Sequence, residues 1–287
     1  MNQPAAQVAT RPAIETIIHY LVDTGVPPVF KQTDNTVDTV FTVGVREEKR
    51  ITVRNARLHP GKFSLDVEGF VLAPHPTKVT DFFDDEQIRT VYIPEVERLV
   101  CQYAGASRAV VYDNTRRSTV QATKEKYRTR EPVPAPHSDY TDISAAQRLR
   151  DVVGDEADTL MKKRFAIVNV WRSIAGTIEE WPLAVCDARS IDDSLMHTFV
   201  RETTHTVEPS FEYSRKSETR HASFDPNHRW YYFPNMTRNE SLLFKNYDTA
   251  RDGKARYCLH SAIVDPSGPA NPAPRESMES RVFAFFD

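Results

Sequence analysis

The sequence predicts a mainly β protein of the α+β class, in which a β-sandwich or barrel carries helices on its outside. Two observations lead to this prediction. Short runs rich in β-branched and aromatic residues recur along the 287 residues, separated by proline, glycine and charged turns. These runs do not alternate regularly with helical segments, which argues against Rossmann and TIM-barrel folds. No linker-like stretch interrupts the chain, so we expect residues 1–287 to form one domain.

The first part of the chain is expected to supply strands and one long helix. Residues 13–22 place apolar side chains at a spacing that suits either a helix or a strand. Three further strands are predicted from β-branched residues bounded by turns, at 37–45, 49–56 and 63–71. Residues 81–102 predict a helix, because acidic residues open the segment and an apolar stripe follows at helical spacing. A strand is expected at 107–112.

The second part of the chain is predicted to hold most of the remaining strands. We expect a helix at 142–160 and strands at 165–171, 183–186, 230–233, 241–247, 256–264 and 280–286. Prolines at 132–136 place His137 in a loop or at a strand edge. Residues 203–227 are polar and are predicted to form a long loop that could act as a lid. Two histidines in and beside it are His221 and His228; most of the remaining histidines are expected to face solvent, with one of them as a candidate for lining the substrate pocket.

Composition excludes several classes of protein. The 37 basic and 40 acidic residues leave a net charge of −3, which does not favour nucleic acid or an anionic membrane as a partner. The cysteines are scattered and form neither a disulfide framework nor a zinc motif: Cys101, Cys186 and Cys258. No apolar run suits a signal peptide or a membrane span, and no phosphate-binding glycine loop occurs. We therefore expect a reduced cytoplasmic protein.

Three residues suggest an iron site: His137 and Asp139 in an H-x-D motif, and the distant His260. Two imidazoles and one carboxylate can occupy one face of a ferrous ion and leave cis positions open for other ligands. On an extended segment, residues i and i+2 point the same way, so His137 and Asp139 can reach one metal. Nine histidines make one such motif expected by chance, and Asp139 could instead act as a cap. His260 lies in an apolar run, where a buried histidine needs a partner.

Basic and hydroxyl side chains after His260 suggest a site for a 2-oxo diacid. Arg275 and Ser277 follow at i, i+2 spacing near the last predicted strand. A guanidinium binds carboxylates bidentately, so Arg275 is the candidate for the far carboxylate of the co-substrate, with Ser277 as a hydrogen-bond donor. Arg281 has the same strand parity and is the reserve candidate. Asn169, Trp171 and Arg172 could also reach the pocket.

Several blocks of this chain resemble the fungal hydroxylase/desaturase family of iron(II)/2-oxoglutarate oxygenases, which is related to the cephamycin 7-methoxylation component. The matching blocks are Asn169-Val-Trp-Arg-Ser-Ile, Pro182-Leu-Ala-Val-Cys-Asp187, Trp230-Tyr-Tyr-Phe-Pro-Asn-Met236, Glu240-Ser-Leu-Leu-Phe-Lys-Asn-Tyr-Asp248 and Arg275-Glu-Ser-Met-Glu-Ser-Arg281. The resemblance spans roughly residue 37 to the C-terminus. The fifteen residues from His260 to Arg275 exceed the ten or so of many plant-type relatives, which leaves the choice between Arg275 and Arg281 open.

This resemblance implies a double-stranded β-helix (jelly-roll) core at about 131–287, on which the strands and helix of about 1–130 pack. It implies Fe(II) held by His137, Asp139 and His260, with 2-oxoglutarate held by Arg275 and Ser277. The implied reaction is hydroxylation, desaturation or endoperoxide formation on a small secondary metabolite, with a terpenoid as one candidate, at the expense of dioxygen. Two alternatives remain open: an iron oxidase that uses no 2-oxo acid, and a non-catalytic β-barrel binding protein. A homodimer is also considered, from base rates alone.

Overall fold

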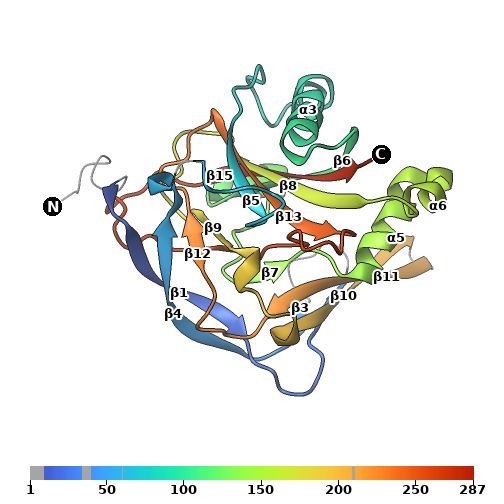
Figure 1. Cartoon of the computed structure of the whole chain (residues 1–287), viewed down its shortest axis with the longest axis horizontal. Helices are drawn as coiled ribbons and strands as arrows, with labels where there is room; N and C mark the ends of the chain where they lie inside the picture. The colour runs from blue at the N-terminus through green and yellow to red at the C-terminus, as the bar shows by residue number, and fades with distance from the viewer. Residues whose placement is uncertain (1–9, 34–39, 60, 209–210) are drawn as a thin grey trace.

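The structure is a computed structural model that describes residues 10–33, 40–59, 61–208 and 211–287. Of the described residues at 30–33, 40–43, 203–208 and 211–216, only the backbone is considered. The described strands β1 to β15 all belong to two sheets (Figure 1). The larger sheet has the order β1 (Ala13–Leu21), β4 (Arg46–Asn55), β12 (Trp230–Tyr232), β9 (Leu183–Cys186), β14 (His260–Ala262), β7 (His137–Ser138), β11 (Phe211–Ala222), β10 (Met196–Glu208), β2 (Val29–Thr33) and β3 (Val40–Val43). The smaller sheet has the order β5 (Phe70–Pro74), β13 (Glu240–Asp248), β8 (Phe165–Ser173), β15 (Glu276–Phe285) and β6 (Arg108–Ser118).

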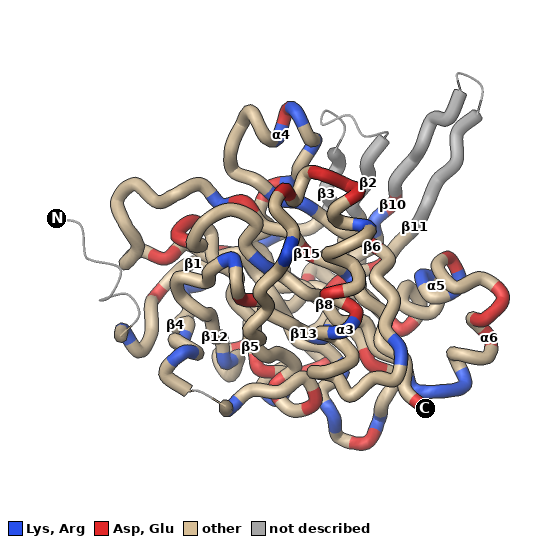
Figure 2. The backbone as a smooth tube through the Cα atoms, turned by 90° about the horizontal axis from the view of Figure 1, so that it is seen from above, with Lys and Arg blue, Asp and Glu red and all other residues tan. Residues whose placement is uncertain are grey.

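Helices lie outside the two sheets, as the sequence predicted. They are α2 (Asp85–Gln87), the π-helical turn η2 (Ile88–Tyr92), α3 (Ile93–Ala104), α4 (Gln121–Tyr127), α5 (Asp142–Val153) and α6 (Ala157–Leu160). Short 3-10 turns occur at η1 (Ala56–Leu58), η3 (Gly154–Glu156), η4 (Ala188–Ser190) and η5 (Asp193–Leu195). Figure 2 shows α3 crossing over the smaller sheet. Among the described residues, no helix has the length and apolar character needed to cross a membrane.

The smaller sheet is buried on both faces, which explains the continuous apolar character of its central strands. Val168 and Val170 of β8 pack in one cluster with Val96 and Val100 of α3. The alternate residue Trp171 packs in another cluster, with side chains of the larger sheet. The two sheets therefore face each other across a shared core and form the predicted jelly-roll arrangement.

The ambiguous segment at residues 13–22 is a strand. It pairs antiparallel with β4, and its side chains alternate between buried and exposed positions. Ile14 and Ile18 are buried in a cluster on the outer face of the larger sheet, whereas Ile17 is 43% exposed. This period of two is the one that a half-buried strand requires.

Several predicted boundaries were wrong. Residues 65–68 form a turn, and the strand begins only at Phe70, after Gly69 with a positive φ of 88°. Gly69 is needed there because an added Cβ would lie 3.1 Å from the Cβ of Cys258. The strand predicted at 256–264 is limited to three residues, since the chain before β14 is irregular. The helix predicted at 142–160 is interrupted by Gly154, also at positive φ.

Three further predicted segments differ from the structure in their ends or in their secondary structure. Of 37–45, the described part forms β3, while residues 37–39 lie outside the described chain. The strand expected at 107–112 continues as β6 to Ser118. The loop predicted at 203–227 is mostly strand, because β10 and β11 pair antiparallel there as a long hairpin. The lid hypothesis, which relied on a loop, therefore loses its structural basis.

The neighbours Ile17 and Ile18 provide a matched test of the strand assignment. Ile18→Ala should lower the free energy of unfolding by about 2–5 kcal/mol, because it leaves a cavity in a packed cluster. Ile17→Ala should change the same free energy by only about 0.5 kcal/mol, because its side chain is exposed. Both values can be measured by denaturant unfolding; equal losses in the two variants would contradict the alternation.

Candidate metal centre between the two sheets

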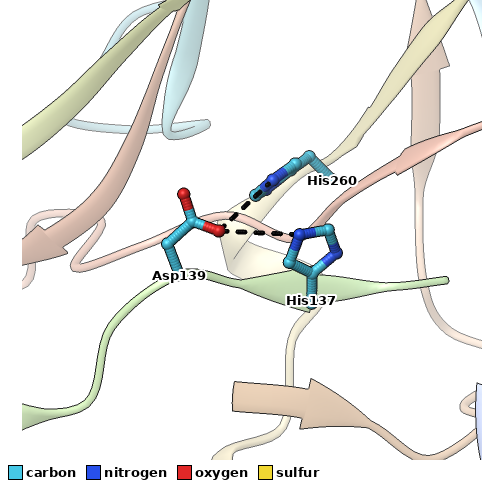
Figure 3. Close-up of side chains that lie close together, drawn as sticks. All are labelled: His137, Asp139 and His260. Atoms are coloured by element: carbon cyan, nitrogen blue, oxygen red, sulfur yellow. Dashed lines mark ion pairs between the residues drawn. The ribbon is translucent and has the colours of Figure 1, made fainter. Parts of the chain in front are cut away.

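The register of the larger sheet brings His137 and His260 together on its inner face. The two residues are direct partners in the pairing of β7 with β14. Asp139 follows β7 two residues after His137 and points to the same place (Figure 3). Its Oδ1 lies 3.5 Å from Nε2 of His137 and 3.9 Å from Nε2 of His260. One ligand atom from each of the three side chains lies within 4.8 Å of the others.

The short strand β7 is held in place by the smaller sheet. The hydroxyl of Ser138 points away from the two histidines and donates to the carbonyl of Asn246 in β13, at 3.0 Å. The side-chain oxygen of Asn246 accepts a hydrogen bond from the backbone N–H of Asp139, also at 3.0 Å. Asn246 thus fixes the backbone on both sides of the turn from β7 to Asp139.

His137 presents a lone pair toward Asp139, and burial favours the neutral form of both imidazoles. Nδ1 of His137 lies 2.7 Å from the carbonyl oxygen of Ala135, which can only accept, so Nδ1 carries the proton and Nε2 is free. Burial lowers the pKa of His137, although the charge of Asp139 acts in the opposite direction. Burial also lowers the pKa of His260, well below its usual value. Neutral imidazoles are the form in which histidine binds metals.

The carboxylate of Asp139 is ionised and oriented by the smaller sheet. Its Oδ2 accepts hydrogen bonds from Nε of Arg281 at 2.9 Å and from Nδ2 of Asn169 at 3.1 Å. Burial alone would raise the pKa of Asp139, but the charge of Arg281, together with its hydrogen bond, holds it well below its ordinary value. With Oδ2 occupied, Oδ1 is the oxygen that faces the histidines.

These residues fit a mononuclear metal ion such as Fe(II). Two ligand atoms at right angles, each about 2.1 Å from a metal, lie about 3 Å apart. The observed 3.5 and 3.9 Å therefore need only small side-chain movements to close around an ion. Nδ1 of His260 is buried and has no hydrogen-bond partner among the described residues, so that ring is not committed to another role. The sequence-predicted triad of His137, Asp139 and His260 is therefore assembled in space.

Arg275 and Ser277 lie close to this cluster and are bonded to each other. Nε of Arg275 donates to Oγ of Ser277 at 3.0 Å, and Nη1 donates to the carbonyl of Trp181 at 2.6 Å. The guanidinium lies 5.0 Å from the centre of the Trp171 ring. Burial lowers the pKa of Arg275 to about 9, so it is still a cation at neutral pH. Its Nη2 makes no hydrogen bond within the described chain and is the nitrogen left for a ligand.

A small cavity connects Arg275 to the histidines. It is lined by Arg117, Val133, His137, Leu183, His260, Ala262, Arg275 and Glu279. Its free volume is about 10 Å³, close to that of one water-sized sphere, so ligands must displace lining side chains. A larger hollow of about 580 Å³, lined by η4 and η5 among others, contains no residue of the candidate metal centre.

Arg281, the reserve candidate for the co-substrate, has all three of its nitrogens engaged. Nε contacts Asp139, and Nη1 donates to Asp113 and, at 3.0 Å, to Thr115. Nη2 lies 2.7 Å from Oε1 of Glu279. A co-substrate carboxylate could reach Arg281 only by breaking one of these contacts.

Other expectations for this region were wrong. His221 is buried rather than solvent-facing: it pairs with His137 across β7 and β11, and the two rings stack at 5.5 Å. Its Nδ1 lies 3.2 Å from Nη2 of Arg46. His228 is also buried, with Nδ1 2.9 Å from the hydroxyl of Tyr20. Arg172 points away from the site, over the rings of Phe82 and Tyr92, as its parity in β8 requires.

Comparison with known proteins supports an enzymatic role. A family model described as "Oxidoreductase/YMDC permease-like domain" matches residues 18–285. The hydroxylase/desaturase efuI of Hormonema carpetanum is 34% identical in an alignment 254 residues long that covers 83% of each chain. The alpha-ketoglutarate-dependent dioxygenase phiK of a fungal species is 30% identical over 230 residues, 78% of this chain and 80% of that one.

A solved structure shares the fold. The iron and alpha-ketoglutarate-dependent endoperoxidase NvfI superposes with a TM-score of 0.82 at 23% identity, over 96% of this chain and 99% of that chain. Fold and relatives together define the class of protein: the chain is an oxidoreductase of the Fe(II)/2-oxoglutarate-dependent dioxygenases. Within that class it belongs to the fungal hydroxylase/desaturase family, which confirms the resemblance found in the sequence.

The bond from Asn169 to Asp139 predicts an effect on metal affinity. Asn169→Ala should weaken Mn(II) binding by about tenfold, because contacts that orient a metal ligand are typically worth 10–100-fold. Manganese affinity can be measured by electron paramagnetic resonance. Asn114→Ala is the control, since Asn114 accepts from Ser280 on the other face of the same sheet. An unchanged affinity in Asn169→Ala would remove its assigned role.

Proposed function

We propose that His137, Asp139 and His260 bind Fe(II), and that Arg275 and Ser277 bind the far carboxylate of 2-oxoglutarate. The observation that carries this proposal is the largely buried cluster of two neutral imidazoles and one ionised carboxylate. Arg275 is favoured over Arg281 because it lines the cavity and one of its nitrogens makes no hydrogen bond within the described chain.

When bound, iron and 2-oxoglutarate together supply the oxidising power from dioxygen, with succinate and carbon dioxide as products. The chain's residues position and shield this chemistry. Arg281 and Asn169 keep Asp139 ionised and turned toward the iron, and Ala135 sets the tautomer of His137. Burial between two sheets excludes water from the reacting groups.

The substrate is proposed to be a small secondary metabolite with a largely apolar body. Val133, Leu183 and Ala262 give the cavity apolar walls near the two histidines. Among relatives, efuI is named a hydroxylase/desaturase and NvfI an endoperoxidase, so hydroxylation, desaturation and endoperoxide formation are the candidate outcomes. A terpenoid remains one candidate substrate. We further propose that residues 1–287 act as one oxygenase domain, in the cytoplasm, with a homodimer as the oligomer to test.

The iron site predicts the effect of losing one ligand. His137→Ala should abolish Fe(II) binding and turnover, since two remaining ligands cannot define the site. Iron binding can be measured anaerobically, and turnover as succinate released per molecule of substrate oxidised. Retained turnover in the variant would refute the triad. Oxygen consumption without succinate would favour the alternative, an iron oxidase that needs no 2-oxo acid.

The assignment of Arg275 predicts a loss of co-substrate affinity. Arg275→Met should weaken 2-oxoglutarate binding by roughly 10–100-fold, the effect of losing one charged hydrogen-bonded contact of about 1.5–3 kcal/mol. Anaerobic titration of the Fe(II) protein with 2-oxoglutarate, followed by the visible metal-to-ligand charge-transfer band, measures this affinity. Arg116→Met is the control, because Arg116 lies on the outer face of β6 and contacts Asp85. Equal affinities in both variants would exclude Arg275 as the anchor.

A further inference from the structure

Arg117 is an interior cation for which the proposed reaction has no role. Its backbone lies opposite Ser277 in the pairing of β6 with β15. The side chains of Asp113 and Thr115, two and four residues earlier in β6, reach Arg281 in the space between the sheets, so the parity of the strand directs Arg117 inward as well. The side chain of Arg117 lines the same cavity as His137.

The partners of Arg117 do not neutralise it. Its Nη1 donates to the backbone carbonyl of Glu131 at 2.7 Å, and no ion pair to a carboxylate is found for it in the described part of the chain. Asp139 of the metal centre and Glu279, which lines the cavity beside Arg117, are both paired with Arg281. Arg281 and Arg117 therefore differ: the first is matched by acids and the second is not.

The surroundings of Arg117 add further positive charge. Arg130 forms an isolated bridge with Arg117 along the backbone. Burial lowers the pKa of Arg117; Glu279 acts in the opposite direction, and the charge of Arg281 lowers it again. Burial, followed by the charges of Arg130, Arg281 and Arg117, lowers the pKa of Arg201 on β10. An anion bound among these groups would relieve their mutual repulsion.

The co-substrate does not supply that anion. Its 2-oxo acid end belongs at the metal and its far carboxylate at Arg275 and Ser277, so both of its charged ends are already matched. The remaining ligand of the cavity is the primary substrate. Besides the residues assigned to the metal and the co-substrate, the cavity is lined by Arg117, by Glu279, whose carboxylate is paired with Arg281, and by three apolar side chains: Val133, Leu183 and Ala262.

We propose that Arg117 binds a carboxylate of the primary substrate, so that the substrate is a carboxylic acid with an apolar body. A guanidinium holds a carboxylate through two parallel hydrogen bonds, which fixes orientation as well as position. The acid group would anchor one end of the molecule and leave a carbon of the apolar body at the metal. This inference rests on the proposed function, because it assumes that metal and co-substrate occupy their own residues.

A paired-ligand experiment tests the inference without knowledge of the natural substrate. The full-length protein is loaded with Mn(II) and N-oxalylglycine, an unreactive analogue of 2-oxoglutarate. Hexanoate and the uncharged hexanamide are the probes, and saturable broadening of their proton resonances by Mn(II) reports binding close to the metal. The variants are Arg117→Met and Arg117→Lys, with Arg116→Met as the control on the opposite face of the same strand.

The wild-type protein should bind hexanoate at least about tenfold more tightly than hexanamide, as expected for one charged contact. Arg117→Met should abolish that preference, Arg117→Lys should keep part of it, and Arg116→Met should keep all of it. Absence of saturable broadening by hexanoate, or equal binding by wild type and Arg117→Met, would overturn the proposal.

The loading step separates this inference from the proposed function. If the wild type fails to bind Mn(II) or N-oxalylglycine, the proposed function itself fails, and the substrate inference falls with it before any probe is added. If Arg117→Met alone loses N-oxalylglycine, Arg117 is the co-substrate anchor, which overturns its role toward the substrate. If all variants load normally, the broadening by hexanoate decides the question.

Discussion

The site depends on the hydrogen bonds that side chains of the smaller sheet donate to the carboxylate of Asp139. The two histidines come from the larger sheet, whereas Arg281 and Asn169, which hold Oδ2 of Asp139, come from β15 and β8. An ionised carboxylate between two sheets would be costly without such partners. The same contacts that make its burial tolerable also turn Oδ1 toward the imidazoles. The two sheets of the jelly roll thus have different roles: the larger sheet carries the two histidines, and the smaller sheet keeps Asp139 ionised and oriented toward them.

The register of β15 determines which of its side chains face the site. Along β15, the alternate residues Ser277, Glu279 and Arg281 face inward, and each has a defined partner across β6 and β8. Shifting this strand by one residue would send all three side chains to the outer face, where α3 packs. The apolar residues between them, such as Met278 and Val282, hold the register because they are buried under α3. The apolar contacts on the outer face of the smaller sheet therefore hold the polar residues of its inner face in position.

The candidate site could be predicted from the sequence where local spacing carries the information. The i, i+2 pairs His137/Asp139 and Arg275/Ser277 depend only on an extended backbone, and both pairs share a face in the structure. Roles that depend on distant strands could not be predicted. Arg117 lies beyond the predicted end of its strand, and its place beside Ser277 is set by a pairing more than 150 residues away in the chain. The hairpin of β10 and β11 was not predicted because its polar composition is typical of a loop. The burial of His221 was missed with it, since that burial follows from pairing with β7.

Three arginines near one cavity differ in function because their partners differ, not because of their own chemistry. Arg281 forms ion pairs with Asp113, Asp139 and Glu279. Its charge is therefore neutralised within the protein, and it orients a metal ligand. Arg275 is bonded to a hydroxyl and a carbonyl, neither of which carries charge, so it remains a cation that an incoming carboxylate can neutralise. Within the described residues, Arg117 donates to a backbone carbonyl, pairs with no carboxylate and lines the cavity. A guanidinium that is wholly or partly buried and pairs with no carboxylate is an unfavourable arrangement that a ligand can relieve, and relief of that cost adds to the affinity for an anion of the right shape. Two such arginines beside one metal centre therefore favour two anionic ligands, of which the co-substrate is one.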